Sequence, residues 1–187
     1  MGLPGRQEAL ALLRQHVKQE NLVRHMLATE AIMRALARRL GGDEELWGIS
    51  GLLHDLDLEI VDNDMNRHAR TTVGILQGIG FPQEGLDAIL AHNGDVLGIQ
   101  LRNNFELAMT AAETITGLVV ACTLVYPTRK VADVQAASIR KRMKEKRFAA
   151  NVNRDRILEI EKTGISLDEL IDISLQAMRG VAADIGL

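Results

Sequence analysis

The most informative segment of the chain reads Trp47-Gly48-Ile49-Ser50-Gly51-Leu52-Leu53-His54-Asp55. It is an apolar helical stretch that ends in a histidine followed directly by an aspartate. Neighbouring residues on an ideal helix diverge by about 100°, so an ion over the edge between His54 and Asp55 is within reach of both. A carboxylate has two oxygens, and Asp55 can therefore also bridge to a second ion. An adjacent His-Asp pair is a weak motif by itself, and its meaning depends on the rest of the chain.

Three more histidines lie on separate helical patterns. His25 shares a helix face with apolar residues and is expected to point inward. His68 opens a later pattern, and His92 ends the next one, Ile89-Leu90-Ala91-His92, where a cation would also favour the helix dipole. Taken one at a time, a core or surface role explains each of them. His16 has no partner pattern and is interpreted as a surface residue.

Glu113 interrupts the apolar segment Ala111-Ala112-Glu113-Thr114-Ile115. An unpaired buried carboxylate is costly, and proteins avoid it by pairing, protonation or metal binding. A surface-facing glutamate is the alternative, but the neighbouring residues offer little other polar company. A mixed set of imidazole and carboxylate ligands favours Mn, Fe, Co, Ni or Zn over Mg and Ca, which prefer oxygen ligands.

The helical pattern continues along nearly the whole chain, and no strand alternation persists. Helices are expected over residues 7–17, 22–40, 44–56, 68–78, 82–91, 105–125, 130–146, 153–162 and 167–185. Gly41-Gly42 is expected to end the second helix, and Asp43 and Ser166 are expected to cap the helices that follow them. Residues 57–67 are predicted to form a loop, and Asn93-Gly94-Asp95 a turn. The sequence therefore predicts an all-α fold.

The bulk composition suits one domain with a sizeable core. The chain has 187 residues, of which 47% are hydrophobic and 25% charged. Its single cysteine, Cys122, lies in an apolar run and is expected to be a buried thiol in a reducing cytosol. The N-terminus lacks a secretory apolar region. The most apolar span, residues 114–126, falls short of the roughly 20 residues that cross a bilayer. We therefore expect a cytoplasmic protein with no membrane partner.

The net charge of -3 hides an asymmetry along the chain. Residues 129–156 carry ten Lys or Arg and three acids, so the remainder is strongly acidic. Such a basic stretch is either a solvated helix face or a surface that attracts anions toward a site.

The order of the candidate ligands gives them a common meaning. The segments that matter are Arg24-His25, Gly51-Leu52-Leu53-His54-Asp55, His68, Ile89-Leu90-Ala91-His92, Ala111–Leu118 and Arg147–Arg154. This ordered set resembles the HD-domain superfamily of metal-dependent phosphohydrolases, and more narrowly its small HDIG-type members. The resemblance implies a single-domain HD-type helical bundle over residues 1–187. Its metal-site core would span about 20–126, with a C-terminal helical extension over 127–187.

The resemblance also implies a ligand set for one or two divalent ions. The first ion would be held by His25, His54, Asp55 and Glu113; in two-metal members Asp55 would bridge, and His68 and His92 would hold the second. The chain departs from the family pattern in three places. Glu113 stands where aspartate is usual, Leu56-Asp57 replaces Ile-Gly, and Asn93 replaces the second histidine of cyclic-dinucleotide members. Hydrolysis of cyclic di-GMP is therefore disfavoured.

The function implied by the resemblance is hydrolysis of a phosphoester through a metal-activated water, with a small phosphorylated molecule, such as a nucleotide, as substrate. Asp55 and Asp57 are the expected catalytic residues, and Asp57 is the expected proton donor to the leaving group. The residues expected to bind the phosphate are Arg24, Arg129, Lys130 and Arg154.

Two alternatives remain open. A di-iron oxygenase of the same fold would use His68 and His92. A non-catalytic sensor or nucleic-acid binder would use the basic stretch, although an aromatic content of only 3% leaves few rings for base stacking. A homo-oligomer is compatible with the sequence.

Overall fold

The computed structural model describes residues 2–187, and in that range the chain is helical without strands. The α-helices are α1 Arg6–His16, α2 Glu20–Leu40, α3 Glu44–Leu53, α4 Arg70–Gly78, α5 Gln83–His92, α6 Gly94–Leu97, α7 Asn104–Val125, α8 Ala136–Lys144, α9 Arg154–Leu158, α10 Leu167–Gly180 and α11 Ala182–Ile185. Two short 3₁₀ helices, η1 Val131–Asp133 and η2 Glu159–Thr163, complete them. The predicted all-α fold is confirmed.

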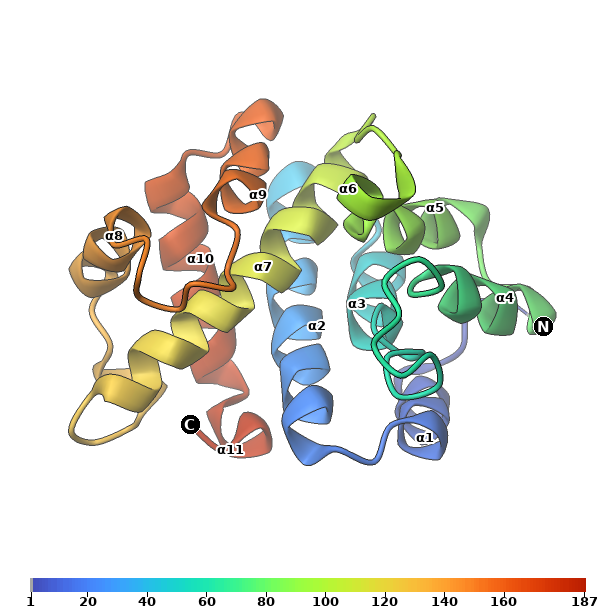
Figure 1. The fold of residues 1–187 in the computed structure, drawn as a ribbon, viewed down its shortest axis with the longest axis horizontal. Coiled ribbons are helices and arrows are strands. Elements are labelled where there is room, and N and C mark those ends of the chain that lie inside the picture. Colours follow the sequence, from blue (N-terminus) through green and yellow to red (C-terminus); the bar gives the residue numbers. More distant parts are fainter. Residues whose placement is uncertain (1) are drawn as a thin grey trace.

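Two long helices, α2 and α7, form the centre of the molecule (Figure 1). Helices α3 to α6 lie on one side of this pair, and α8 to α11 lie on the other. Helix α2 packs against α3, α7, α10 and α11, whereas α7 packs against α5, α8, α9 and η2. Both sides of the molecule therefore share one hydrophobic core that runs through α2 and α7.

The predicted helix boundaries at capping residues are confirmed. The Asp43 side chain accepts hydrogen bonds from the backbone N–H groups of Glu45 and Leu46, and Ser166 accepts one from Glu169. Gly41 ends α2 with φ +72°, a left-handed conformation that glycine adopts without steric cost. Local side-chain chemistry determines these ends, which is why they can be read from the sequence.

Other predicted boundaries are wrong. The turn expected at residues 93–95 instead begins the short helix α6, which ends at Gly98 with φ +69°. The helix expected over 130–146 is divided into η1 and α8, and the last helix is interrupted at Val181. Helix α4 begins at Arg70 rather than at His68, because Ala69 takes φ +67° and cannot continue a right-handed helix.

Helix α7 begins one residue before the predicted 105, and its apolar part is longer than the span of residues 114–126 that the sequence pattern indicated. Among residues 2–187 it is the one helix whose length, 22 residues, and mean hydropathy, 1.6, are sufficient to cross a membrane. About two thirds of that apolar window, 67%, is buried inside the protein. Contacts with the surrounding helices therefore account for its composition, as in the core helix of a folded domain.

Candidate metal centre

Close packing of α3 on α2 brings the first candidate ligands together. A Cβ atom on Gly51 would lie 3.2 Å from the backbone oxygen of Thr29, so a larger residue would push the two helices apart. With the two helices this close, the ring of His54, which follows the end of α3, lies beside the ring of His25 on α2. Their ring centroids are 5.2 Å apart. The small residue in the apolar segment is therefore part of what assembles the site.

Four histidines converge around the carboxylate of Asp55, and we refer to the five residues as the histidine cluster: His25, His54, Asp55, His68 and His92. They form two groups that share Asp55, and within each group the candidate ligand atoms lie within 4.8 Å of one another. Oδ2 of Asp55 is 3.4 Å from Nε2 of His54 and 3.7 Å from Nε2 of His25. Oδ1 is 3.3 Å from Nε2 of both His68 and His92. Each carboxylate oxygen thus faces one pair of imidazoles.

Hydrogen bonds from the outer nitrogens to backbone carbonyls orient two of these rings. Nδ1 of His54 lies 2.8 Å from the carbonyl oxygen of Gly51, and Nδ1 of His92 bonds the carbonyl of Ile89. A carbonyl only accepts, so each Nδ1 carries the proton and, in the neutral ring, each Nε2 presents a lone pair to the cluster. Nε2 of His54 is buried and has no hydrogen-bond partner among the described residues. An orphaned buried acceptor of this kind is what a metal ligand requires.

The spacing of the ligand atoms fits a transition-metal ion. Two ligands that bind an ion at about 2.1 Å and at right angles are separated by about 3.0 Å, and by about 3.4 Å at the tetrahedral angle. Nε2 of His68 and Nε2 of His92 are 2.9 Å apart, and each is 3.3 Å from Asp55. The group of His68, His92 and Asp55 therefore suits one ion beside Oδ1 of Asp55.

The ionisable groups of the histidine cluster shift one another's pKa values. Burial by itself would raise the pKa of Asp55, but the neighbouring imidazoles of His54, His68 and His92 hold it well below its usual range. Burial disfavours the charged form of His68, yet hydrogen bonds to Asp55 and Asp57 outweigh it and raise the pKa to about 9. Burial lowers the pKa of His25 and of His92. The cluster thus holds an ionised carboxylate and at least one imidazolium in the space where an ion would bind.

The comparisons with known proteins agree with this geometry. The HD domain family matches residues 22–123, which is more than half of the chain and runs from α2 to α7. The chain belongs to the HD domain family.

A curated relative supports the assignment of this HD domain protein. The chain is 22% identical over 165 residues to ribonuclease Y of Sulfurovum sp. (strain NBC37-1). The similar region covers 87% of the chain but 32% of that relative, so the chain spans about a third of its length. No solved structure matches the chain.

Asp57, the predicted proton donor, lies against the outer nitrogen of His68, and its role in proton donation stays a prediction. Its side chain is fully buried behind His68: Oδ1 is 2.7 Å from Nδ1 of His68, and Oδ2 accepts a hydrogen bond of 2.9 Å from the backbone N–H of Thr72. Both oxygens of its carboxylate are therefore engaged by groups of the protein. Its position is that of a residue that orients a metal-ligating histidine.

Glu113 lies beside the cluster, but its carboxylate faces an arginine that the sequence pattern did not single out. Oε1 of Glu113 is 2.8 Å from the guanidinium of Arg156 and 2.7 Å from the Thr114 hydroxyl. The same guanidinium nitrogen donates to the backbone carbonyl of His92. Glu113 is in neither group of clustered ligands, so its role as a ligand stays a prediction. Arg156 was missed because 42 residues separate it in sequence from Thr114, which it also contacts.

The other cations predicted to bind phosphate lie away from the HD site. Arg129 and Lys130 follow the C-terminal end of α7, and the part of that helix between Glu113 and Val125 is roughly 18 Å long. Arg24 lies beside Gly186 near the C-terminus of the chain and 3.9 Å from Glu20. Nothing in the structure directs these side chains toward the cluster.

Arg154 has a structural role. Its guanidinium donates to the carbonyl oxygens of Ala149 and Val152, at 2.7 and 2.6 Å, and to that of Phe148. It therefore holds the turn before α9 together instead of facing a substrate. Within the basic stretch, Arg140 pairs with Asp168 and Arg142 with Glu145. Arg156 is the member of this stretch that reaches the metal centre.

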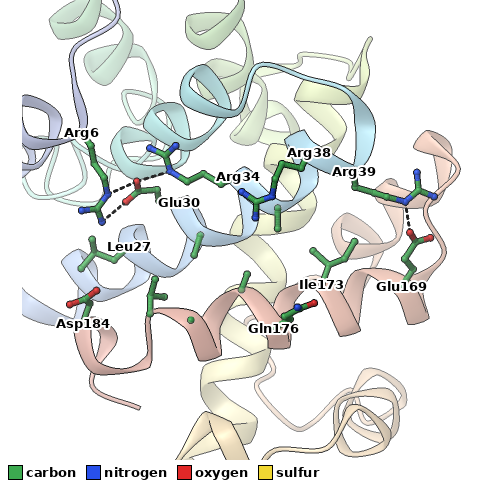
Figure 2. A pocket seen from close by; sticks show the side chains of 15 residues that line it. Arg6, Leu27, Glu30, Arg34, Arg38, Arg39, Glu169, Ile173, Gln176 and Asp184 are labelled. Carbon is green, nitrogen blue, oxygen red and sulfur yellow. Dashed lines mark hydrogen bonds and ion pairs between the residues drawn. The ribbon is translucent and has the colours of Figure 1, made fainter.

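A sizeable groove is a feature separate from the histidine cluster. A groove of about 840 Å³ lies between α2 and α10, and we call it the α2–α10 groove (Figure 2). Glu30 is buried there and accepts from Arg6 at 2.7 Å and from Arg34 at 3.0 Å. Arg39 pairs with Glu169 across the groove at 2.5 Å. These three arginines and two glutamates are thus matched by partners within the protein.

Proposed function

We propose that this HD domain protein is a metal-dependent phosphohydrolase that acts on a nucleotide or another phosphoester. The observation that carries the proposal is the pair of imidazole groups that share the carboxylate of Asp55, with Nε2 atoms facing the same space. Mixed nitrogen and oxygen ligands favour Mn, Fe, Co, Ni or Zn, in one or two positions. An ion held by these residues would supply an activated water molecule as the nucleophile.

The protein side chains provide the remaining functions. Asp55 and the four histidines hold the site in place, and Asp57 fixes the ring of His68 through its outer nitrogen. Arg156 is the cation that binds the phosphate. Its side chain is 17% exposed, and it already lies against a carboxylate, Glu113, whose oxygens resemble those of a phosphate. A guanidinium in this position stabilises negative charge that develops on the phosphoryl oxygens.

The substrate panel follows from the chemistry and from the relative. Nucleoside monophosphates and simple phosphomonoesters test the small-molecule reading. Short RNA oligonucleotides belong in the panel because the similar curated protein is named ribonuclease Y. Since the chain spans about a third of that protein, RNA cleavage is one arm of the test and not the expected activity.

The test is removal and restoration of metal. The protein is stripped with a chelator, metal content is measured, and phosphate release is assayed across the panel after addition of Mn²⁺ or Fe²⁺. We expect activity only after metal is restored, and none from Asp55→Asn at any metal concentration. If no metal restores turnover of any phosphoester, the proposal is wrong. Oxygen consumption by the iron-loaded protein without phosphate release would favour the oxygenase alternative.

A further inference from the structure

A second hollow adjoins the metal centre. It has a volume of about 450 Å³ and lies between α6, the segment that follows it, and α9, and we call it the α6–α9 pocket. Ala91 and Gly94, which flank the metal-ligand segment His92-Asn93, form part of its wall. The volume falls in the range of small-molecule sites.

Arg156 lies between this pocket and the histidine cluster and contacts residues on both sides. One guanidinium nitrogen, Nη2, contacts the carbonyl of His92 and the carboxylate of Glu113, on the side of the metal centre. The other, Nη1, is 3.3 Å from Asp95, which lines the pocket. A molecule whose phosphate contacts Arg156 therefore has the pocket directly beside it.

Thr110 lines the pocket and carries an unsatisfied hydroxyl. Three other threonines of α7, Thr114, Thr116 and Thr123, donate their hydroxyls to the carbonyl four residues earlier at 2.8 Å. Thr110 does not: its Oγ1 is buried, the residue is 3% exposed, and no partner is present among the described residues. An unmet buried hydroxyl is costly, and a polar ligand in the pocket would satisfy it.

The charges of the pocket point to hydroxyl groups and away from a further anion. Its charged side chains are Arg156, Lys162, Asp95, Asp155 and Glu159. Both cations have protein partners, because Arg156 pairs with Asp95 and Lys162 with Glu159. Asp155 makes no ion pair with any described residue. Free acceptors and an excess of carboxylates suit a sugar with adjacent hydroxyls, which carboxylates recognise in nucleotide sites.

We propose that the α6–α9 pocket holds the sugar of a sugar phosphate or nucleotide whose phosphate is bound at the metal centre. This inference rests on the proposed function and adds a substrate class to it. Thr110 and Asp155 are the residues that would contact the sugar hydroxyls, while Arg156 stays on the phosphate.

The test is direct binding to the whole protein reconstituted with Mn²⁺, measured by calorimetry. Two non-hydrolysable probes differ only in the sugar: the phosphonate analogue of ribose 5-phosphate, and methylphosphonate. We expect the ribose phosphonate to bind at least about tenfold more tightly than methylphosphonate. Thr110→Val and Asp155→Asn should each reduce this preference by roughly tenfold and leave methylphosphonate binding unchanged.

Thr123→Val is the matched control, because it removes a buried α7 hydroxyl that is already bonded and lies away from the pocket. It should preserve the sugar preference. Thermal unfolding shows whether each variant folds, and Asp155→Asn, at an exposed position, remains informative if Thr110→Val does not. Equal binding of the two probes by the wild type, or an unchanged preference in both variants, would overturn the inference. Because binding needs no turnover, that result would leave the phosphohydrolase proposal standing, and failed turnover would leave this measurement valid.

Discussion

The histidine cluster and the α2–α10 groove lie on opposite faces of α2 and differ in how their polar atoms are paired. In the groove, Glu30 bonds two arginines, and Arg39 has Glu169 as its partner. In the cluster, Nε2 of His54 has no partner, and Nε2 atoms of His68 and His92 face each other at 2.9 Å. The groove is a sizeable hollow, yet it is the cluster that contains a buried ring nitrogen without a partner among the described residues.

This difference separates stabilising charge networks from binding sites. A buried ion pair neutralises itself, and the loss of one partner costs folding energy because the other charge stays buried. The buried Nε2 of His54, which has no partner among the described residues, costs energy in the protein by itself, and a bound cation would relieve that cost. The size of a hollow by itself would therefore place the binding site on the wrong face of α2. Four substitutions or measurements test the comparison, beginning with the largest expected effect.

Loss of the shared carboxylate should abolish the cluster's function. Asp55→Asn removes the one residue common to both ligand groups. We expect metal content to fall to background and phosphohydrolase activity to fall by more than the roughly 10–100-fold typical of outer-sphere partners. Elemental analysis and phosphate release provide the two measurements. Retention of both metals in this variant would show that Asp55 is not the bridge.

Asp57→Asn should weaken one half of the cluster selectively. Without the carboxylate on Nδ1, the ring of His68 loses its fixed orientation, and affinity for the ion on the His68 side should fall by roughly 10–100-fold. The ion near His25 and His54 should bind as before. A titration with Mn²⁺ followed by electron paramagnetic resonance separates the two. Asp62→Asn, an exposed acid in the same loop, is the control and should change neither affinity.

Glu30→Gln, in the groove, should lower stability and leave the metal site unchanged. The substitution leaves two arginines with half of their shared partner, and we expect the free energy of unfolding to fall by about 2 kcal/mol. Metal content and activity should be unchanged. Urea denaturation measures the free energy of unfolding, and elemental analysis and phosphate release measure metal content and activity. Glu169→Gln, in an exposed pair, should cost at most about 1 kcal/mol. Loss of metal in Glu30→Gln would mean that the two regions are coupled.

Cys122 provides the smallest effect and a reference for burial without a ligand role. Burial raises the pKa of its thiol from the ordinary 9.0 to about 11. The folded protein should therefore react with iodoacetamide at pH 8 roughly a hundredfold more slowly than the unfolded chain. Because the unfolded thiol ionises first, the free energy of unfolding should decrease as the pH rises above 9 toward 11. Rapid alkylation of the native protein would show that this part of the core opens.

The sequence was most informative where chemistry is local or where a whole pattern was present. Asp43 and Ser166 cap the helices they were expected to cap, because a cap depends on two or three neighbouring residues. The ordered histidines predicted a common site, and the structure brings four of them around Asp55. The sequence was least informative about cations. Arg154 bonds backbone carbonyls, whereas Arg156, two residues later, reaches the metal centre.

Composition and helical periodicity were enough by themselves to predict an all-α fold, and the order of the candidate ligands, through its resemblance to the HD-domain superfamily, predicted a buried cluster of residues that could bind metal. Each of these properties is expressed along the chain and does not depend on distant contacts. Only the tertiary structure decided that Asp57 supports His68, that Arg156 meets Glu113, and that an orphaned hydroxyl lies beside the site. Those relations join segments 11 to 43 residues apart or depend on a missing neighbour. Neither a distant contact nor an absent one leaves a periodic signal in the sequence.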